Sequence, residues 1–409
     1  MPRVLLLLPV ASYRNQDFLD AAQHLGIEVV CAADHCHQLA AQQGLTPLLS
    51  LHFDQPEAAT KHVLTALGRR IDAVLAVDDA GVELAAMLCQ QLGLPGNTLA
   101  AVRVSRDKLA FRQLLRDTGL NCPAFYRHQN GMGAQLPYPV VVKPRRLSAS
   151  RGVMRANTVA DFTLAIHQTQ QIQQRDDRDA AQLGLLVESF IPGAEYALEG
   201  LLENGQLRVL ALFDKPDPLD GPYFEETIYV TPSRLAAAQQ QAITRNVATT
   251  CAAMGLTHGA IHAEMRVNGS GVWLLEIAAR SIGGLCGRML RTRLGISLEA
   301  LILRHALNLP IALPDDDSAS GVMMIPVPMR GNYQGVDGLA AARSVPNIDA
   351  IQISAHPGQH IAPAPESASY LGFIFSRAAT PALAEAALRD AHARLTFDIQ
   401  PDLTLRKQP

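Results

Sequence analysis

Two glutamates with the spacing of a metal site lie on either side of a short glycine-rich turn. Residues 261–267 alternate apolar and charged side chains, and a second short run, 272–277, follows the turn at 268–271. Alternate side chains of a strand point to opposite faces, so the pattern predicts a β-hairpin. A three-residue loop, 269–271, places Glu264 opposite Glu276. A four-residue loop pairs Glu264 with residue 275 and turns Glu276 to the other face.

The first of these registers has a chemical consequence. Like charges directly opposite each other destabilise a hairpin unless a cation lies between them. Carboxylate oxygens are ligands that Mg²⁺ prefers, and Mg²⁺ commonly takes one or two carboxylates together with substrate phosphates. Glu264 and Glu276 are therefore candidate metal ligands, with His262 and Arg280 on the same predicted faces. A solvated sheet face often carries such residues too, and the hairpin alone leaves both interpretations open.

A lysine ends an apolar strand further upstream. Pro139-Val140-Val141-Val142-Lys143 runs into a loop of small polar residues that contains Ser148, Ser150 and Gly152. The amides and hydroxyls of such a loop can close over a phosphate group. The loop is not a Walker A motif, because G-x-x-x-x-G-K-[ST] is absent. Taken alone, the segment fits an ordinary exposed loop beside a lysine nearly as well as it fits a phosphate-binding loop.

A third segment combines a strand, a turn and an acid. Residues 186–191 are mostly apolar, Pro192-Gly193 makes a turn, and Glu195 follows. An extended hinge can read adenine with its backbone amide and carbonyl groups, and an acid a few residues later can accept hydrogen bonds from ribose hydroxyls. By itself the segment indicates only a strand, a turn and another strand.

Strands and helices alternate over the first hundred residues. This region precedes the three candidate site segments in the chain and is expected to support them. Val4–Val10 and Glu28–Ala33 are predicted strands and Asp17–Leu25 a predicted helix. Such alternation is typical of a parallel sheet with both faces covered. The turn after the first strand contains no glycine, whereas a dinucleotide-binding fold has G-x-G-x-x-G there. An NAD-dependent oxidoreductase is therefore disfavoured.

Composition narrows the class of protein. The chain has 409 residues, of which 48% are apolar and 18% charged, so it is long enough for several domains and not disordered. A net charge of −3 argues against nucleic acid as a partner. No stretch reaches the roughly 20 apolar residues that span a membrane, and residues 4–11 are better explained as a buried strand than as a signal peptide. We expect a cytoplasmic protein with no membrane partner.

Together, and in this order, the three segments resemble those of the ATP-grasp carboxylate–amine ligases, and most closely the L-amino-acid ligases that form dipeptides. The resemblance covers nearly the whole chain. It implies an α/β protein with the ATP-grasp fold. Its expected parts are an N-terminal parallel α/β domain at 1–100, a core subdomain with the phosphate loop at 101–184, a core subdomain with the hinge and metal carboxylates at 185–310, and a mixed C-terminal domain at 318–409.

The resemblance also implies a role for each matching residue. The residues expected to bind ATP are Lys108, Lys143, Ser148, Ser150, Glu188, Ser189, Phe190, Ile191 and Glu195. Those expected to bind metal are Glu264 and Glu276, and those expected near substrate are Asp79, Glu226, Arg280 and Gly283. Arg280 and Lys143 are expected to be catalytic. Many relatives have an asparagine where this chain has Ala278, so the number of Mg²⁺ ions is expected to be one or two, with Mn²⁺ as an alternative.

The reaction that the resemblance implies joins an amino-acid carboxylate to an amine, with ADP and phosphate released from an acyl-phosphate. The expected partners are small-molecule substrates, with a homodimer as a possible assembly. Two alternatives stay open. One is another ATP-grasp chemistry, such as carboxylation or amide synthesis on a purine precursor. The other is a non-catalytic nucleotide-binding protein, against which Arg280 argues because binding alone does not require it.

Overall fold

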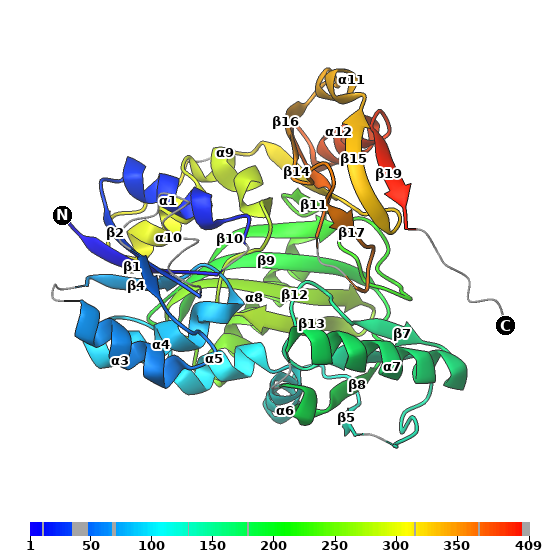
Figure 1. The fold of residues 1–409 in the computed structure, drawn as a ribbon, viewed down its shortest axis with the longest axis horizontal. Coiled ribbons are helices and arrows are strands. Elements are labelled where there is room, and N and C mark those ends of the chain that lie inside the picture. Colours follow the sequence, from blue (N-terminus) through cyan, green and yellow to red (C-terminus); the bar gives the residue numbers. More distant parts are fainter. Residues whose placement is uncertain are drawn as a thin grey trace.

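The computed structural model describes residues 1–9, 12–34, 48–67, 71–129, 131–177, 180–314, 316–366 and 369–402. Within these residues the strands form four sheets. Figure 1 shows a long central sheet with a parallel α/β region at one end, a smaller sheet and helix below it, and the C-terminal region above it. The parallel N-terminal α/β region expected from the sequence is present, and antiparallel sheets follow it.

The N-terminal region is the parallel α/β unit predicted from the alternation of strands and helices. Its sheet has the order β3-β2-β1-β4, and β1 pairs in parallel with both β2 and β4. The strand β1 is buried on both faces, which explains its continuous run of leucines. It ends at Leu8, and Val10 of the predicted strand lies outside the described residues. The strands are Arg3–Leu8, Glu28–Ala33, Leu48–Ser50 and Ala73–Ala76, and the helices are α1 (Asn15–His24), α3 (Pro56–Ala66) and α4 (Val82–Leu92).

The central sheet has eight strands in the order β13-β12-β9-β10-β11-β14-β18-β16. Its last three strands come from the C-terminal region, so the residues predicted as a separate domain at 318–409 continue the sheet of the core. The strands are β9 (Ala194–Glu203), β10 (Gln206–Lys215), β11 (Ile228–Thr231), β12 (Gly259–Asn268), β13 (Gly271–Ala278), β14 (Ala319–Ile325), β16 (Ile348–Ile353) and β18 (Gly372–Ala378).

Helix α8 (Ala237–Met254) covers one face of this sheet. Its buried residues include Ile243, Val247 and Cys251, whose spacing of four places them on one face of the helix. Gly255 ends the helix with a left-handed backbone conformation, as a glycine there predicts. Helices α9 (Arg291–Leu294) and α10 (Leu298–Ala306) also belong to this part of the chain.

The smaller sheet carries the phosphate loop. Its order is β5-β8-β6-β7, and all its pairs are antiparallel. Helix α7 packs on it, and the Thr158 and Asp161 side chains cap the start of that helix reciprocally. The elements are β5 (Phe125–His128), β6 (Val140–Pro144), β7 (Met154–Ala156), β8 (Leu185–Ser189), α7 (Val159–Asp176), and the preceding α5 (Leu99–Arg106) and α6 (Lys108–Thr118).

The remaining C-terminal elements form a small sheet of order β17-β15-β19 beside the central sheet. They are β15 (Gly331–Asp337), β17 (His360–Ile361), β19 (Thr396–Pro401), α11 (Leu339–Arg343) and α12 (Pro381–His392). Helix α12 buries its alanine and leucine face in the hydrophobic core that also contains residues of β14 and β18. Over the described part of the chain, every helix is too short or too polar to cross a membrane.

Candidate active site

The two predicted metal carboxylates lie directly opposite each other, but the hairpin achieves this differently from the prediction. Asn268 pairs with Gly271, so the loop contains two residues rather than three. That register alone would pair Glu264 with residue 275. A β-bulge at Leu275 inserts one extra residue into β13, and Glu264 therefore faces Glu276. Of the two registers that the sequence left open, the pairing of Glu264 with Glu276 is the one present, and it is reached through a two-residue loop and a bulge instead of a three-residue loop.

A buried arginine supports the bulge. Arg112, on α6, donates from Nη1 to the carbonyl oxygens of Leu274 and Leu275, at 3.2 and 2.9 Å. The same guanidinium donates to both carboxylate oxygens of Glu188, at 2.7 and 3.2 Å, and its side chain is only 1% exposed. Arg112 thereby connects the bulged strand, and with it Glu276, to the hinge segment at the end of β8.

Glu188 also holds the predicted phosphate lysine. The ammonium of Lys143 lies 2.5 Å from Glu188 Oε1. Burial alone would raise the pKa of Glu188, but the charges and hydrogen bonds of Arg112 and Lys143 lower it to about 2. Burial lowers the pKa of Lys143, and Glu188 opposes that effect. The side chain of Glu188 therefore acts as a buried anchor between two cations.

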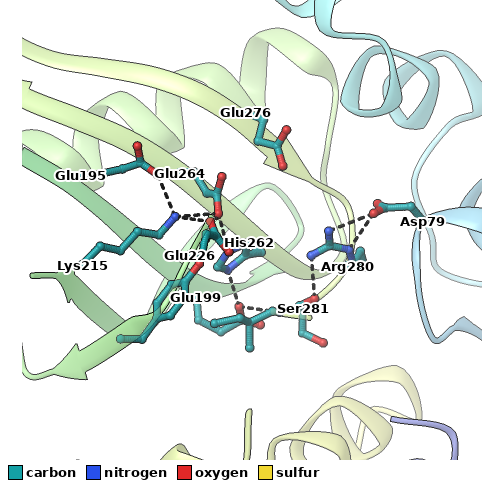
Figure 2. Close-up of polar contacts among 12 residues, drawn as sticks. Asp79, Glu195, Glu199, Lys215, Glu226, His262, Glu264, Glu276, Arg280 and Ser281 are labelled. Carbon is teal, nitrogen blue, oxygen red and sulfur yellow. Dashed lines mark hydrogen bonds and ion pairs between the residues drawn. The ribbon is translucent and has the colours of Figure 1, made fainter. Parts of the chain in front are cut away.

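Each predicted metal carboxylate has a lysine beside it. Lys108, the first residue of α6, lies 3.3 Å from Glu276 Oε2 and donates to the Leu147 carbonyl at 2.7 Å. Lys215, the last residue of β10, contacts three carboxylates at once (Figure 2). Its ammonium lies 2.9 Å from Glu195, 2.5 Å from Glu226 and 2.9 Å from Glu264.

The three glutamates around Lys215 form a cluster of carboxylates that could hold a cation. One carboxylate oxygen from each of Glu195, Glu226 and Glu264 lies within 4.8 Å of the others. Burial would lower the pKa of Lys215, but the three carboxylates raise it well above its ordinary value, so the ammonium is charged. Burial and the neighbouring Glu264 raise the pKa of Glu226 to about 7.

A histidine positions Glu264 from behind. His262 Nδ1 lies 3.1 Å from Glu199, and Nε2 lies 3.5 Å from Glu264. Burial would lower the pKa of His262, but hydrogen bonds to the two glutamates raise it to about 9. Glu199 also accepts from the backbone N–H of Ile282 at 2.9 Å, which ties this network to the segment after Arg280.

Arg280 faces the N-terminal region. Its Nε and Nη2 atoms donate to Asp79 Oδ2 at 3.1 and 2.9 Å, as Figure 2 shows. Burial opposes the charged form, but Asp79 raises the pKa of Arg280, which stays a cation. A second arginine, Arg14, donates to the Ser281 carbonyl and hydroxyl oxygens at 3.3 and 2.5 Å, and so fixes the residue that follows Arg280.

The phosphate loop has a strained backbone. Ala149 and Ser150 have φ values of 55° and 53°, and Gly152 has a φ of 69°. A left-handed conformation costs a residue with a Cβ about 1–2 kcal/mol. Such strain clusters at ligand-binding sites, and here it curls the loop so that Ser148, Ala149 and Ser150 all line the cavity.

The hinge offers one backbone donor to a ligand. The N–H of Ser189 donates to Ala124, and that of Phe190 donates to Pro139, at 2.9 and 3.0 Å. The described residues provide no acceptor for the N–H of Ile191, which lines the cavity. Arg266 donates to the Ile191 carbonyl at 2.8 Å and to Glu195 at 3.2 Å, which fixes the hinge against the acid predicted to bind ribose.

A single cavity between the smaller sheet and the central sheet gathers nearly all the predicted site residues. Two predicted residues lie outside it. Ser189 does not line the cavity, and Asp79 lines a neighbouring open cleft while it holds Arg280. The predicted residues that do line the cavity are Lys108, Lys143, Ser148, Ser150, Glu188, Phe190, Ile191, Glu195, Glu226, Glu264, Glu276, Arg280 and Gly283.

Known protein families match three successive parts of the chain. The ATP-grasp domain matches residues 136–289, which contain the predicted phosphate loop, the predicted hinge and both predicted metal carboxylates. The ATP-grasp N-terminal domain matches residues 19–96, and the L-amino acid ligase C-terminal domain 2 matches residues 323–400. The chain belongs to the ATP-grasp superfamily. The resemblance to ATP-grasp ligases that the sequence motifs suggested is thus confirmed over most of the chain.

Individual relatives of this ATP-grasp chain agree with that assignment. The crystal structure of an L-amino acid ligase from Bacillus licheniformis superposes with a TM-score of 0.84 at 25% identity, over 98% of this chain and 99% of that chain. Carnosine synthase 1 from Gallus gallus is 29% identical over 335 residues, and that from Homo sapiens 25% over 346 residues. These matches cover 76% and 78% of this chain but only 36% and 41% of the synthases, so the chain spans less than half the length of these relatives.

Sequence reasoning missed two residues of this ATP-grasp site, Lys215 and Arg112. Arg112 had a signal in the sequence, whereas Lys215 did not. Extension of the pairing of Glu203 with Gln206 along the hairpin would place Asp214 opposite Glu195, and a bulge between Val209 and Ala211 brings Lys215 there instead. Arg112 lies three residues from both Leu109 and Leu115, which places a charge on the buried face of α6.

Proposed function

We propose that this protein is an ATP-dependent ligase that joins an amino-acid carboxylate to an amine through an acyl-phosphate. One observation carries the proposal: a pair of opposed carboxylates, two lysines and an arginine line one cavity. The carboxylates are Glu264 and Glu276, and the cations are Lys108, Lys143 and Arg280. The match of residues 323–400 to the L-amino acid ligase C-terminal domain supports an amino acid as the substrate.

ATP would lie between the two sheets. The N–H of Ile191 is placed to donate to the adenine ring, and Glu195 is placed to accept from the ribose hydroxyls. The strained phosphate loop and Lys143 would bind the phosphate groups, since a charge-assisted hydrogen bond is about twice as strong as a neutral one. Lys215 would contribute a further positive charge, because its ammonium already lies beside the predicted metal ligand Glu264.

The residues present fit a divalent cation. Glu264 and Glu276 supply carboxylate oxygens, the ligands that Mg²⁺ prefers, and each is now balanced by a lysine ammonium. Bound Mg²⁺ would neutralise the phosphate charge during phosphoryl transfer. The network of His262 and Glu199 would hold Glu264 in place through its 3.5 Å contact. We propose one or two Mg²⁺ ions, for which Mn²⁺ could substitute.

The reaction needs activation of a poor electrophile. A carboxylate oxygen of the substrate would attack the γ-phosphorus of ATP, and the bond from that phosphorus to ADP would break. The amine would then attack the carbonyl carbon of the acyl-phosphate, phosphate would leave, and the nitrogen would lose a proton. Arg280 is suited to hold the carboxylate and then the oxyanion, because its planar fork matches both.

Water must be kept from the acyl-phosphate. The C-terminal region closes over the phosphate loop: the N–H of Gly152 donates to the Pro365 carbonyl at 3.3 Å, and Arg175 donates to the Glu366 carbonyl at 2.9 Å. These contacts join the loop after β6 and helix α7 to the loop between β17 and β18. Further closure of the loop at 147–153 over bound ATP would exclude water and strengthen the charge interactions inside the cavity.

The test is a screen for phosphate release with ATP, Mg²⁺ and pairs of amino acids, with mass spectrometry of the products. We expect release that requires amino acids, together with a product whose mass is the sum of two substrates less one water. Release that requires bicarbonate instead would indicate a carboxylase. Nucleotide binding without turnover across the whole screen would indicate a non-catalytic protein.

The remaining properties expected from the sequence stay predictions. We propose small-molecule amino-acid or carboxylate substrates, a cytoplasmic location and a homodimer. Analytical ultracentrifugation of the purified chain measures the last of these directly, and a sedimentation coefficient of a 44.1 kDa monomer at micromolar concentration would contradict it.

A further inference from the structure

A buried arginine lies where the N-terminal region meets the core. Arg14 directly precedes helix α1, and its side chain is only 4% exposed. Burial lowers the pKa of Arg14, and the carboxylate of Glu299 on α10, 3.8 Å away, opposes that effect. Removal of a charged group from water is costly unless partners compensate it. The hydrogen-bond partners of Arg14 therefore indicate what the buried guanidinium does.

The guanidinium of Arg14 donates to both segments that form the Asp79–Arg280 pair. Its Nη1 atom donates to the carbonyl of Val77, two residues before Asp79, at 3.1 Å. The same atom donates to the carbonyl of Ser281, the residue after Arg280, at 3.3 Å, and Nη2 donates to the Ser281 hydroxyl at 2.5 Å. One side chain thus joins the segment after β4 to the segment after β13.

The Asp79–Arg280 pair does not by itself fix the orientation of Arg280. Nε and Nη2 of Arg280 both donate to a single oxygen, Oδ2 of Asp79, at 3.1 and 2.9 Å. Two parallel hydrogen bonds to two separate oxygens would fix the plane of a guanidinium, and that geometry is absent from this pair. A third contact supplies the constraint, because Nη1 of Arg280 donates to the Ser281 carbonyl at 3.0 Å (Figure 2).

The Ser281 carbonyl is therefore shared by two buried guanidinium groups. Arg280 and Arg14 both donate to it, and each has its own carboxylate partner, Asp79 for the first and Glu299 for the second. The carbonyl cannot turn away from Arg280 without loss of its contact with Arg14. The position of Arg14 thus determines where Arg280 finds its acceptor.

We propose that Arg14 is a positioning residue for the reaction: it holds the Ser281 carbonyl and thereby sets the plane in which Arg280 meets the carboxylate substrate. Arg14 does not line the active-site cavity, so it acts through Arg280 and not on the substrate. This inference rests on the proposed ligase function and adds a residue from outside the cavity. It also gives the N-terminal region a part in catalysis, because Arg14 and Val77 both belong to that region.

The orientation of Arg280 matters at two steps of the proposed reaction, the binding of the carboxylate and the attack of the amine. A displacement of about 1 Å in a positioned group can cost about a hundredfold in rate. A tilted Arg280 would bind the carboxylate substrate more weakly and would stabilise the oxyanion less. Water would then attack more of the acyl-phosphate, which releases phosphate and regenerates the carboxylate. The ratio of amide formed to phosphate released measures this loss.

Arg14→Lys tests the proposal with the amino-acid pair that gives product in the wild-type screen. Lysine keeps the positive charge beside Glu299 but lacks the planar fork that reaches Val77 and Ser281 together. We expect KM for the carboxylate substrate to rise about tenfold, and the ratio of amide to phosphate to fall about twofold or more, as a partly misplaced group requires. ATP affinity, measured by calorimetry, is expected to stay at the wild-type value.

Arg288→Met is the matched control, because Arg288 also joins α1 to the core. It donates to Asp17 on α1 and to Gln352 on β16, at 2.7 and 2.6 Å, and its side chain is 39% exposed. Such an exposed pair contributes little, and Arg288→Met is expected to resemble the wild type in KM and in the ratio of amide to phosphate. Equal changes in Arg288→Met and Arg14→Lys would assign the effect to docking of the N-terminal region in general and would overturn the inference.

A purely structural role of Arg14 would give a different result. It would lower kcat through a smaller fraction of folded enzyme, with KM and the ratio of amide to phosphate unchanged, and that result would overturn the inference and leave the ligase proposal standing. Amide from no amino-acid pair with the wild-type chain would instead remove the proposed function, and the inference with it.

Ser281→Ala decides the question if Arg14→Lys does not fold. It removes only the hydroxyl that accepts from Nη2 of Arg14 and leaves the carbonyl in place. We expect the same two changes at about threefold, the size that loss of one hydrogen bond gives. Unchanged KM and an unchanged ratio of amide to phosphate in folded Ser281→Ala would then overturn the inference.

Discussion

Replacement of Glu188 by glutamine tests the buried link between the hinge, the phosphate lysine and the metal hairpin. Glu188 accepts from Arg112 at 2.7 and 3.2 Å and contacts Lys143 at 2.5 Å, and its side chain is 2% exposed. Glutamine keeps the shape of the side chain and removes the charge. Two buried cations are then left without their shared counter-ion, the condition in which loss of a buried partner is most costly.

The structure gives the size of the effect. The pKa of Glu188 falls from 4.5 to about 2 on folding, against the effect of burial, through Arg112 and Lys143. A difference of this size corresponds to about 3 kcal/mol of stability at neutral pH. Breaking a buried ion pair from one side costs about 3–5 kcal/mol, which agrees. Because the folded-state pKa is lowered, this stability is present above pH 4.5 and is lost as the pH falls toward 2.

The assay is chemical denaturation of wild type and Glu188→Gln at a series of pH values. We expect the difference in free energy of unfolding to be about 3 kcal/mol at neutral pH and to fall below half of that by about pH 3. Asp117→Asn is the control, because the Arg116–Asp117 pair is 64% and 69% exposed and is expected to contribute little. A difference below about 1 kcal/mol at neutral pH, or one that does not narrow in acid, would refute the role given to Glu188.

Three further predictions concern the chemistry of the site. Arg280→Lys is expected to retain ATP affinity, measured by calorimetry. Product formation, measured by mass spectrometry, is expected to fall on the order of a hundredfold, because lysine lacks the planar guanidinium group with its two parallel donors. Equal loss of ATP affinity and product formation would make Arg280 a nucleotide-binding or folding residue. Glu276→Gln is expected to raise the Mg²⁺ concentration needed for half-maximal turnover, and wild-type turnover at limiting Mg²⁺ would contradict the metal assignment. Lys143→Met is expected to weaken ATP binding or single-turnover phosphoryl transfer by about 1.5–3 kcal/mol, through loss of a charge-assisted contact; no change in either quantity would show that Lys143 serves only to balance Glu188.

The hairpin at 264–276 separates local from tertiary information. The alternation of side chains predicted two strands and the opposed glutamates, since side-chain period and turn residues are properties of a short segment. The hairpin sequence alone left two registers open, and neither included the two-residue loop with a bulge that the structure has. A bulge at Leu275 restores the pairing, and its carbonyls bind Arg112, which is more than 160 residues away in the sequence. No pattern within the hairpin contains that contact.

Local patterns in the chain specify the parallel N-terminal unit, the order of predicted phosphate loop, hinge and carboxylates, and the types of residue that a nucleotide site needs. These follow from hydrophobic period and motif order, which are local. Folding alone places Lys215 among three glutamates, pairs Asp79 with Arg280, and joins the C-terminal strands to the central sheet. Such contacts join segments far apart in the chain, and they form because burial of a charge requires a partner wherever the fold brings one near.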